Sequence, residues 1–123
     1  MSVRLQVWES LVSMVRVYAH AASLNGVACD VTTSAEAAVV TRKGATLTIR
    51  YSEETGDGCW RLVHLVPALT GSGDCEEWGG FHIDEHGVLM FPAGPKELDT
   101  AAIDWIDHLV HASTIEPVSI LKT

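Results

Sequence analysis

Cysteine is scarce in this sequence, and its placement predicts neither a disulfide framework nor a zinc site. Cys29, Cys59 and Cys75 form an odd set with no CxxC pair. Secreted disulfide-rich domains and structural zinc sites need paired or regularly spaced cysteines. Reduced thiols are the simpler interpretation, so we expect a cytoplasmic protein.

Long apolar runs are also absent. No run approaches the roughly 20 residues that a membrane-spanning helix requires. The N-terminus, Met1-Ser2-Val3-Arg4, leads into a segment that carries charges, so it lacks the apolar centre of a signal peptide. We expect no contact with a membrane. The length of 123 residues and the hydrophobic content of 47% suit a single domain, residues 1–123.

Basic residues are few, and most of them lie in the first half of the chain. The sequence has 16 acidic and 8 basic residues, which gives a formal net charge of -8. Up to Arg61 six acids balance six bases, whereas ten acids from Asp74 to Glu116 accompany only Lys96 and Lys122. Phosphate binding needs a basic surface, so direct nucleic-acid binding is disfavoured. The acidic half is either an ordinary solubility surface or a surface that attracts a basic partner.

Catalytic motifs are missing too. There is no GxSxG sequence to present a serine nucleophile. Gly71-Ser72-Gly73 lacks the Lys-Ser/Thr ending of a phosphate-binding loop. The sequence therefore does not indicate an enzyme, and no cofactor is expected.

The clearest pattern that is present runs from residue 37 to residue 66. Residues 45–51 alternate between apolar and polar side chains, which is typical of a half-buried strand. Residues 37–41 precede this strand across a Lys-Gly turn, and residues 59–66 follow it after a polar loop. These segments predict a three-stranded antiparallel meander with one apolar face.

Further strands are predicted on both sides of the meander. Residues 27–33 alternate weakly and suit a short edge strand, and residues 81–91 suit a second hairpin. We expect Pro67 to end the preceding strand and residues 70–74 to form a Gly-rich loop. The prediction is an antiparallel sheet of about five strands.

Two helices are predicted at the chain ends, over residues 3–24 and about 96–112. The first is apolar except for one narrow polar stripe, and Asn25-Gly26 supplies its stop signal. Two arrangements explain such a wide apolar arc: the helix lies between its sheet and the last helix, or it packs against a second copy of the chain. We favour a homodimer through this helix. The fold class is therefore α+β, with the sheet packed against both helices.

Histidines and acids give weak metal-ligand candidates. Asp104, His108 and His111 follow an i, i+4, i+7 spacing that puts them on one side of the last helix, where they suit a divalent ion. His82 and His86 add ligands if their hairpin lies nearby. An exposed polar face is the simpler interpretation, so no metal site is predicted outright.

Tryptophan supplies the other indication of a binding surface. Trp78 lies between two glutamates and two glycines, where no periodic element is predicted. An exposed tryptophan among acids is typical of a partner-binding hot spot, whereas the alternative is a side chain folded over the end of the sheet. The predicted partner-binding residues are Glu76, Glu77, Trp78, Asp84 and Glu85.

The helix–strands–helix order resembles two kinds of small protein at the level of the fold alone. It resembles the type III secretion chaperones, which are dimers that wrap an effector segment, and the cystatins, whose sheet wraps the first helix. The sequence thus predicts a small acidic, non-enzymatic binding protein that engages a basic partner through its second half. The alternative is a small-ligand or metal-binding domain, possibly catalytic, with a pocket between sheet and helix.

Overall fold

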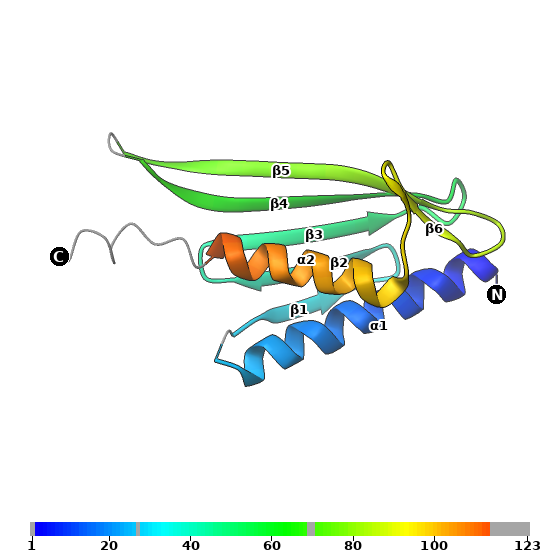
Figure 1. Ribbon diagram of the computed structural model, residues 1–123, viewed down its shortest axis with the longest axis horizontal. Helices are drawn as coiled ribbons and strands as arrows, with labels where there is room; N and C mark the ends of the chain where they lie inside the picture. The colour runs from blue at the N-terminus through cyan, green and yellow to red at the C-terminus, as the bar shows by residue number, and fades with distance from the viewer. Residues whose placement is uncertain (1, 27, 69–70, 114–123) are drawn as a thin grey trace.

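The computed structural model describes residues 2–26, 28–68 and 71–113. Two helices lie side by side on one face of a single antiparallel sheet (Figure 1), which confirms the predicted α+β class. The sheet has seven strands in sequence order, rather than about five. The elements are α1 (Val3–Leu24), β1 (Asp30–Thr33), β2 (Ala37–Arg42), β3 (Ala45–Tyr51), β4 (Asp57–Ala68), β5 (Gly71–Ile83), β6 (Leu89–Phe91), β7 (Gly94–Pro95) and α2 (Leu98–Ser113).

α1 occupies the range that the sequence predicts. The Ser2 hydroxyl accepts a hydrogen bond from the Leu5 backbone N–H at 3.1 Å, so it caps the first turn. The helix ends before Gly26, whose φ of 89° is the left-handed conformation that glycine adopts easily. Among the described residues, neither helix is long and apolar enough to cross a membrane.

The sheet buries one face under the helices. Along β3, Ala45, Leu47, Ile49 and Tyr51 are buried, whereas the residues between them are half-buried or exposed. Trp8 of α1, which is 2% exposed, stacks on Tyr51 with ring centroids 5.2 Å apart. The alternating burial along β3 confirms the predicted period-two pattern. The contact between Trp8 and Tyr51 joins the first helix to the sheet.

β4 and β5 form one long hairpin, which corrects the loop predicted over residues 71–74, whereas residue 70 of that prediction lies outside the described residues. β4 continues through Pro67 to Ala68, and it pairs with β5 along its whole length. The pairing of β3 with β4 ends at His64, so in the described chain the segment that contains Pro67 is bonded only to β5. A proline fits there because its missing N–H can face the unpaired side.

Phe81 of β5 lies at the centre of an aromatic cluster. Its ring centroid lies 5.6 Å from that of Trp105 on α2 and 5.9 Å from that of Phe91 on β6. The ring covers Gly58, its cross-strand partner, so closely that a Cβ on Gly58 would overlap it. The cluster ties β4, β5, β6 and α2 together.

Replacing Gly58 by alanine is expected to lower the free energy of unfolding by about 1–3 kcal/mol, because the enclosed Phe81 ring must shift. Gly80→Ala is the control, since a Cβ there meets only the Gly58 carbonyl oxygen at 3.7 Å. The control should change stability by no more than about 0.5 kcal/mol. Urea unfolding of both variants provides the measurement, and equal losses would contradict the steric explanation.

Candidate functional site

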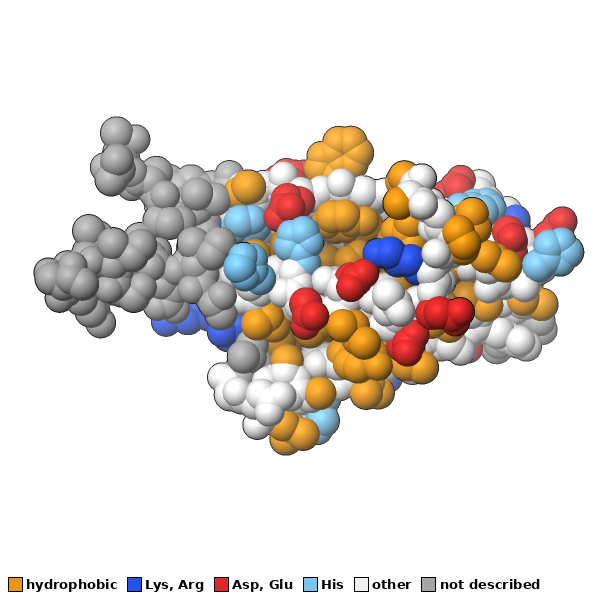
Figure 2. Space-filling view, in the orientation of Figure 1, with side chains coloured by type: hydrophobic (Ala, Val, Ile, Leu, Met, Phe, Trp, Pro, Cys, Tyr) orange, Lys and Arg blue, Asp and Glu red, His pale blue; other side chains and the backbone are white. Residues whose placement is uncertain are grey.

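The helix-covered face of the β4–β5 hairpin carries polar side chains next to α2. His64 of β4 and Glu77 of β5 lie on this face, in phase with the buried Leu62. His108 projects from α2 toward the same place. We call His64, Glu77 and His108 the histidine cluster. In Figure 2, histidine side chains gather beside carboxylates on the left of the displayed face.

Both histidines of this cluster direct a ring nitrogen at one carboxylate. His108 Nε2 lies 3.1 Å from Glu77 Oε1 and 3.0 Å from Oε2, and His64 Nε2 lies 3.5 Å from Oε2. A carboxylate only accepts hydrogen bonds, so His108 Nε2 is the donor in its bond to Glu77, whereas the longer His64 contact is an electrostatic one. Glu77 therefore links the end of α2 to the centre of the hairpin.

His64 is the buried member of the histidine cluster. It is 8% exposed, and its Nδ1 has no hydrogen-bond partner within the described residues. A proton on Nδ1 would leave a buried N–H unpaired, which is costly. His64 therefore has a buried ring nitrogen whose hydrogen-bonding capacity no described residue satisfies.

Trp60 packs against the hydrophobic core on one side and lies beside His108 of the histidine cluster on the other. Its ring centroid lies 6.2 Å from that of His108, at an interplanar angle of 52°. The indole covers Gly79, where a Cβ would lie 2.7 Å from the indole Nε1. Glycine at position 79 thus allows the indole to lie flat against β5 beside His108.

The five weak metal-ligand candidates do not converge. Asp104 forms an ion pair with Lys96 at 2.8 Å, and His82 contacts Asp57 at 2.9 Å. His82 lies five residues from Glu77 along β5, about 16 Å away at the usual rise of a strand. His86 lies in the β5–β6 turn, and His111 lies one turn beyond His108 on α2. No group of three His, Cys, Asp or Glu side chains suited to a metal ion occurs among the residues that the structure describes.

The five predicted partner-binding residues lie on three different surfaces. Glu76 and Trp78 belong to the sheet face opposite the helices, whereas Glu77 belongs to the histidine cluster. Asp84 and Glu85 lie in the turn after β5. No single flat surface holds all five.

Trp78 lies in a regular strand, which corrects the prediction that no periodic element contains it. It is 74% exposed, and its cross-strand partner is Arg61. Arg61 forms an ion pair with Glu76, with Nε 2.8 Å from Oε1. The tryptophan therefore stands on the open sheet face beside an arginine. Cys59, on the neighbouring strand β4, is also exposed.

Asp84 has a local structural role. Its Oδ1 accepts hydrogen bonds from the backbone N–H groups of Val88 and His86, both at 2.9 Å. These bonds, with Val88 the larger contributor, lower the pKa of the Asp84 carboxyl below its usual value. The carboxylate therefore stabilises the turn while it is ionised, and this contribution is lost as the pH falls through the folded-state pKa.

Sequence reasoning missed His64 as a member of the site. Its position could be inferred from the alternation along β4. His64 shares a strand face with the buried Leu62, so its side chain points toward the helices. Its neighbours Glu77 and His108 were not predictable partners, because the sequence predicts a Gly-rich loop at residues 70–74 and no strand between that loop and residue 81. Without the β5 strand, nothing placed Glu77 on a defined face.

A double-mutant cycle tests the contact between α2 and the hairpin. Glu77→Gln and His108→Gln, alone and together, should show a coupling of about 0.2–1 kcal/mol in the free energy of unfolding, the range for partly exposed ion pairs. Glu76→Gln with His108→Gln is the control, because Glu76 lies on the opposite face of β5. Its coupling should be zero within error. Equal coupling in both cycles would refute a direct contact.

Comparisons with known proteins add no family to this geometry. No protein-family model matches the chain, and neither a curated protein nor a solved structure matches it. The geometry of the chain's own residues is therefore the basis for a functional proposal.

Proposed function

We propose that this protein is a small, non-enzymatic binding protein that acts as a homodimer and engages a basic partner through its acidic second half. The observation that carries the proposal is the combination of carboxylates and an apolar groove along α2. Its three free cysteines suit a reducing, cytoplasmic location.

α2 has an acidic outer side. The helix contains Asp99, Asp104 and Asp107, all exposed, and no lysine or arginine. Acids therefore outnumber bases on this helix as they do in the second half of the chain. A surface of one charge sign raises the encounter rate with an oppositely charged partner, most strongly at low salt.

An apolar groove runs beside this acidic side, between α1 and α2. It has a volume of about 280 Å³. Tyr18 and Ala22 line it from α1, Ile103 and Val110 line it from α2, and Asp107 lies at the same place. Figure 2 shows hydrophobic side chains and carboxylates side by side on this face. A basic amphipathic segment would place an apolar side chain in the groove and a lysine or arginine against Asp107.

Glu76 and Glu77 already have partners, and so does Asp104 of α2, which forms an ion pair with Lys96 at 2.8 Å. Glu76 is paired with Arg61, and Glu77 is paired with His108. A partner that used these two glutamates would first have to displace Arg61 and His108. Reversal of both to lysine tests their part in partner capture, and we expect a smaller loss than from reversal on α2.

Reversal of Asp104 and Asp107 to lysine should weaken binding of an amphipathic lysine–leucine peptide about tenfold or more, equivalent to about 1.4 kcal/mol. The control is Glu36→Lys with Glu54→Lys, which changes the net charge equally but lies in the first half of the chain. Fluorescence anisotropy at two salt concentrations gives both affinities. Equal loss in the two variants would show a general charge effect and refute a site on α2.

A small-ligand site at the histidine cluster is the second candidate function. The buried His64 Nδ1, which has no hydrogen-bond partner among the described residues, and the shared Glu77 carboxylate support it. Such groups suit a ligand that donates hydrogen bonds, or a divalent ion after rearrangement of the side chains.

Native mass spectrometry of protein purified without chelator tests this second candidate. The candidate predicts an added mass that disappears in His108→Ala and persists in His86→Ala, a histidine outside the cluster. A wild-type protein with no added mass, even after incubation with Zn²⁺, would refute the metal version.

A further inference from the structure

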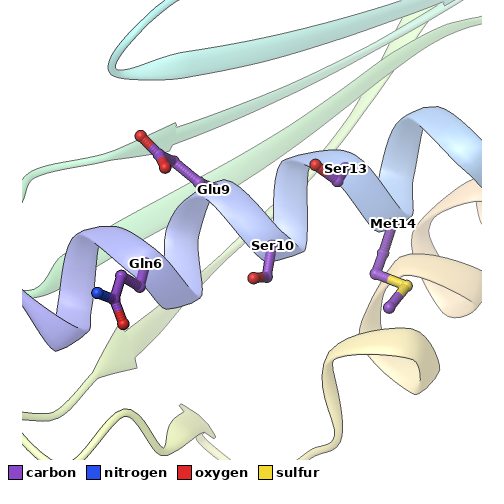
Figure 3. A pocket seen from close by; sticks show the side chains of 5 residues that line it. All are labelled: Gln6, Glu9, Ser10, Ser13 and Met14. Atoms are coloured by element: carbon purple, nitrogen blue, oxygen red, sulfur yellow. The ribbon is translucent and has the colours of Figure 1, made fainter.

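The outer side of α1 carries a row of residues that neither the sheet nor α2 covers. Val3, Val17 and Leu24 are 47%, 59% and 76% exposed. Ser10 continues the row at the same seven-residue spacing. Seven residues make nearly two helical turns, so the four side chains lie on one side of the helix. Met14, at 36% exposed, borders the row on the side of α2 (Figure 3).

This row has a hollow in its N-terminal half and a projection in its C-terminal half. The hollow is a shallow, open depression on the polar side of the helix (Figure 3), lined by Gln6, Glu9, Ser10, Ser13 and Met14. The short serine side chains form its floor, whereas Val17 projects into solvent two turns beyond Ser10. A surface that carries both a hollow and a projection can be complementary to itself under a two-fold rotation.

We propose that two copies of the chain pair through α1 in antiparallel orientation, with the helices crossing near Ser13. In this arrangement Val17 of each copy enters the serine hollow of the other. Val3 of each copy lies near Leu24 of the other, so the exposed apolar residues at the helix ends are also covered. This geometry rests on the proposed homodimer, and it specifies how the two copies meet.

Charges along the edge of the row fit the same pairing. Glu9 and Arg16 lie seven residues apart, on the edge that faces away from α2. An antiparallel crossing near Ser13 brings Glu9 of one copy within reach of Arg16 of the other, twice by symmetry. Arg16 Nη2 donates a hydrogen bond to Thr33 Oγ1 at 2.8 Å, which holds the guanidinium at this edge.

The charge distribution favours α1 over α2 as the contact between copies. Two chains that each carry a net charge of -8 repel one another. α1 contains Arg4, Glu9 and Arg16, so it has no net negative charge, whereas α2 contains three aspartates, of which Asp104 is paired with Lys96. A second copy is therefore repelled least at α1, and α2 remains open to a basic partner.

Substitution of Val17 by glutamate tests the contact, because it places a charge in the hollow of the second copy. Sedimentation velocity should show a wild-type dimer and a dissociation constant at least tenfold higher for Val17→Glu. Thr41→Glu is the control, since it adds the same charge at an exposed position of β2. Circular dichroism verifies that both variants stay folded. A wild-type monomer at about 100 μM would overturn the homodimer itself.

Cysteine cross-linking tests the antiparallel orientation, in a Cys59→Ser background that removes the exposed native thiol. Ser13→Cys should give a disulfide-linked dimer, because position 13 of one copy lies near position 13 of the other. Leu24→Cys should not, because an antiparallel pair separates the two copies of position 24. Cross-linking of Leu24→Cys alone, or a dimer that Val17→Glu does not weaken, would overturn this geometry while leaving peptide binding by α2 unaffected.

Discussion

The pairing of β4 with β5 is the interaction on which the rest of the structure depends. It begins at Asp57 and His82 and extends to Ala68 and Gly71. Because side chains alternate between the faces of a strand, this one register decides the position of every residue along the hairpin. It puts Phe81 over Gly58 in the core, turns Glu77 toward α2 and turns Trp78 to the open face. A shift by one residue would reverse all three positions.

Helix packing adds a second constraint, because both helices lie on the same face of the sheet. α1 and α2 cover that face together, so each helix keeps an outer side. The outer side of α1 combines a few exposed apolar residues with polar ones such as Ser10 and Ser13 and carries no net negative charge, whereas that of α2 is acidic. This division gives the molecule two chemically different surfaces side by side. It is the physical reason for assigning self-association to one helix and a basic partner to the other.

Glycine and aromatic residues act together on the hairpin. Phe81 covers Gly58, and Trp60 covers Gly79, so each bulky ring lies over a position without a side chain. Both contacts stabilise the same pair of strands, and Trp60 also contacts His108. The histidine cluster thus rests directly on the element that organises the core. A substitution in the histidine cluster is therefore expected to alter the packing of α2.

The sequence by itself determined the α+β class, the limits of α1 and the burial pattern of β3, because each of these follows from local periodicity. The extent of β5 was not predictable, since its Gly-rich start resembles a loop until β4 supplies a strand to pair with. For the same reason the sequence did not reveal that Glu76 and Glu77 face opposite sides. Only the tertiary structure decided that His64 and His108 share Glu77, because that contact joins residues far apart in the chain through packing and not through spacing.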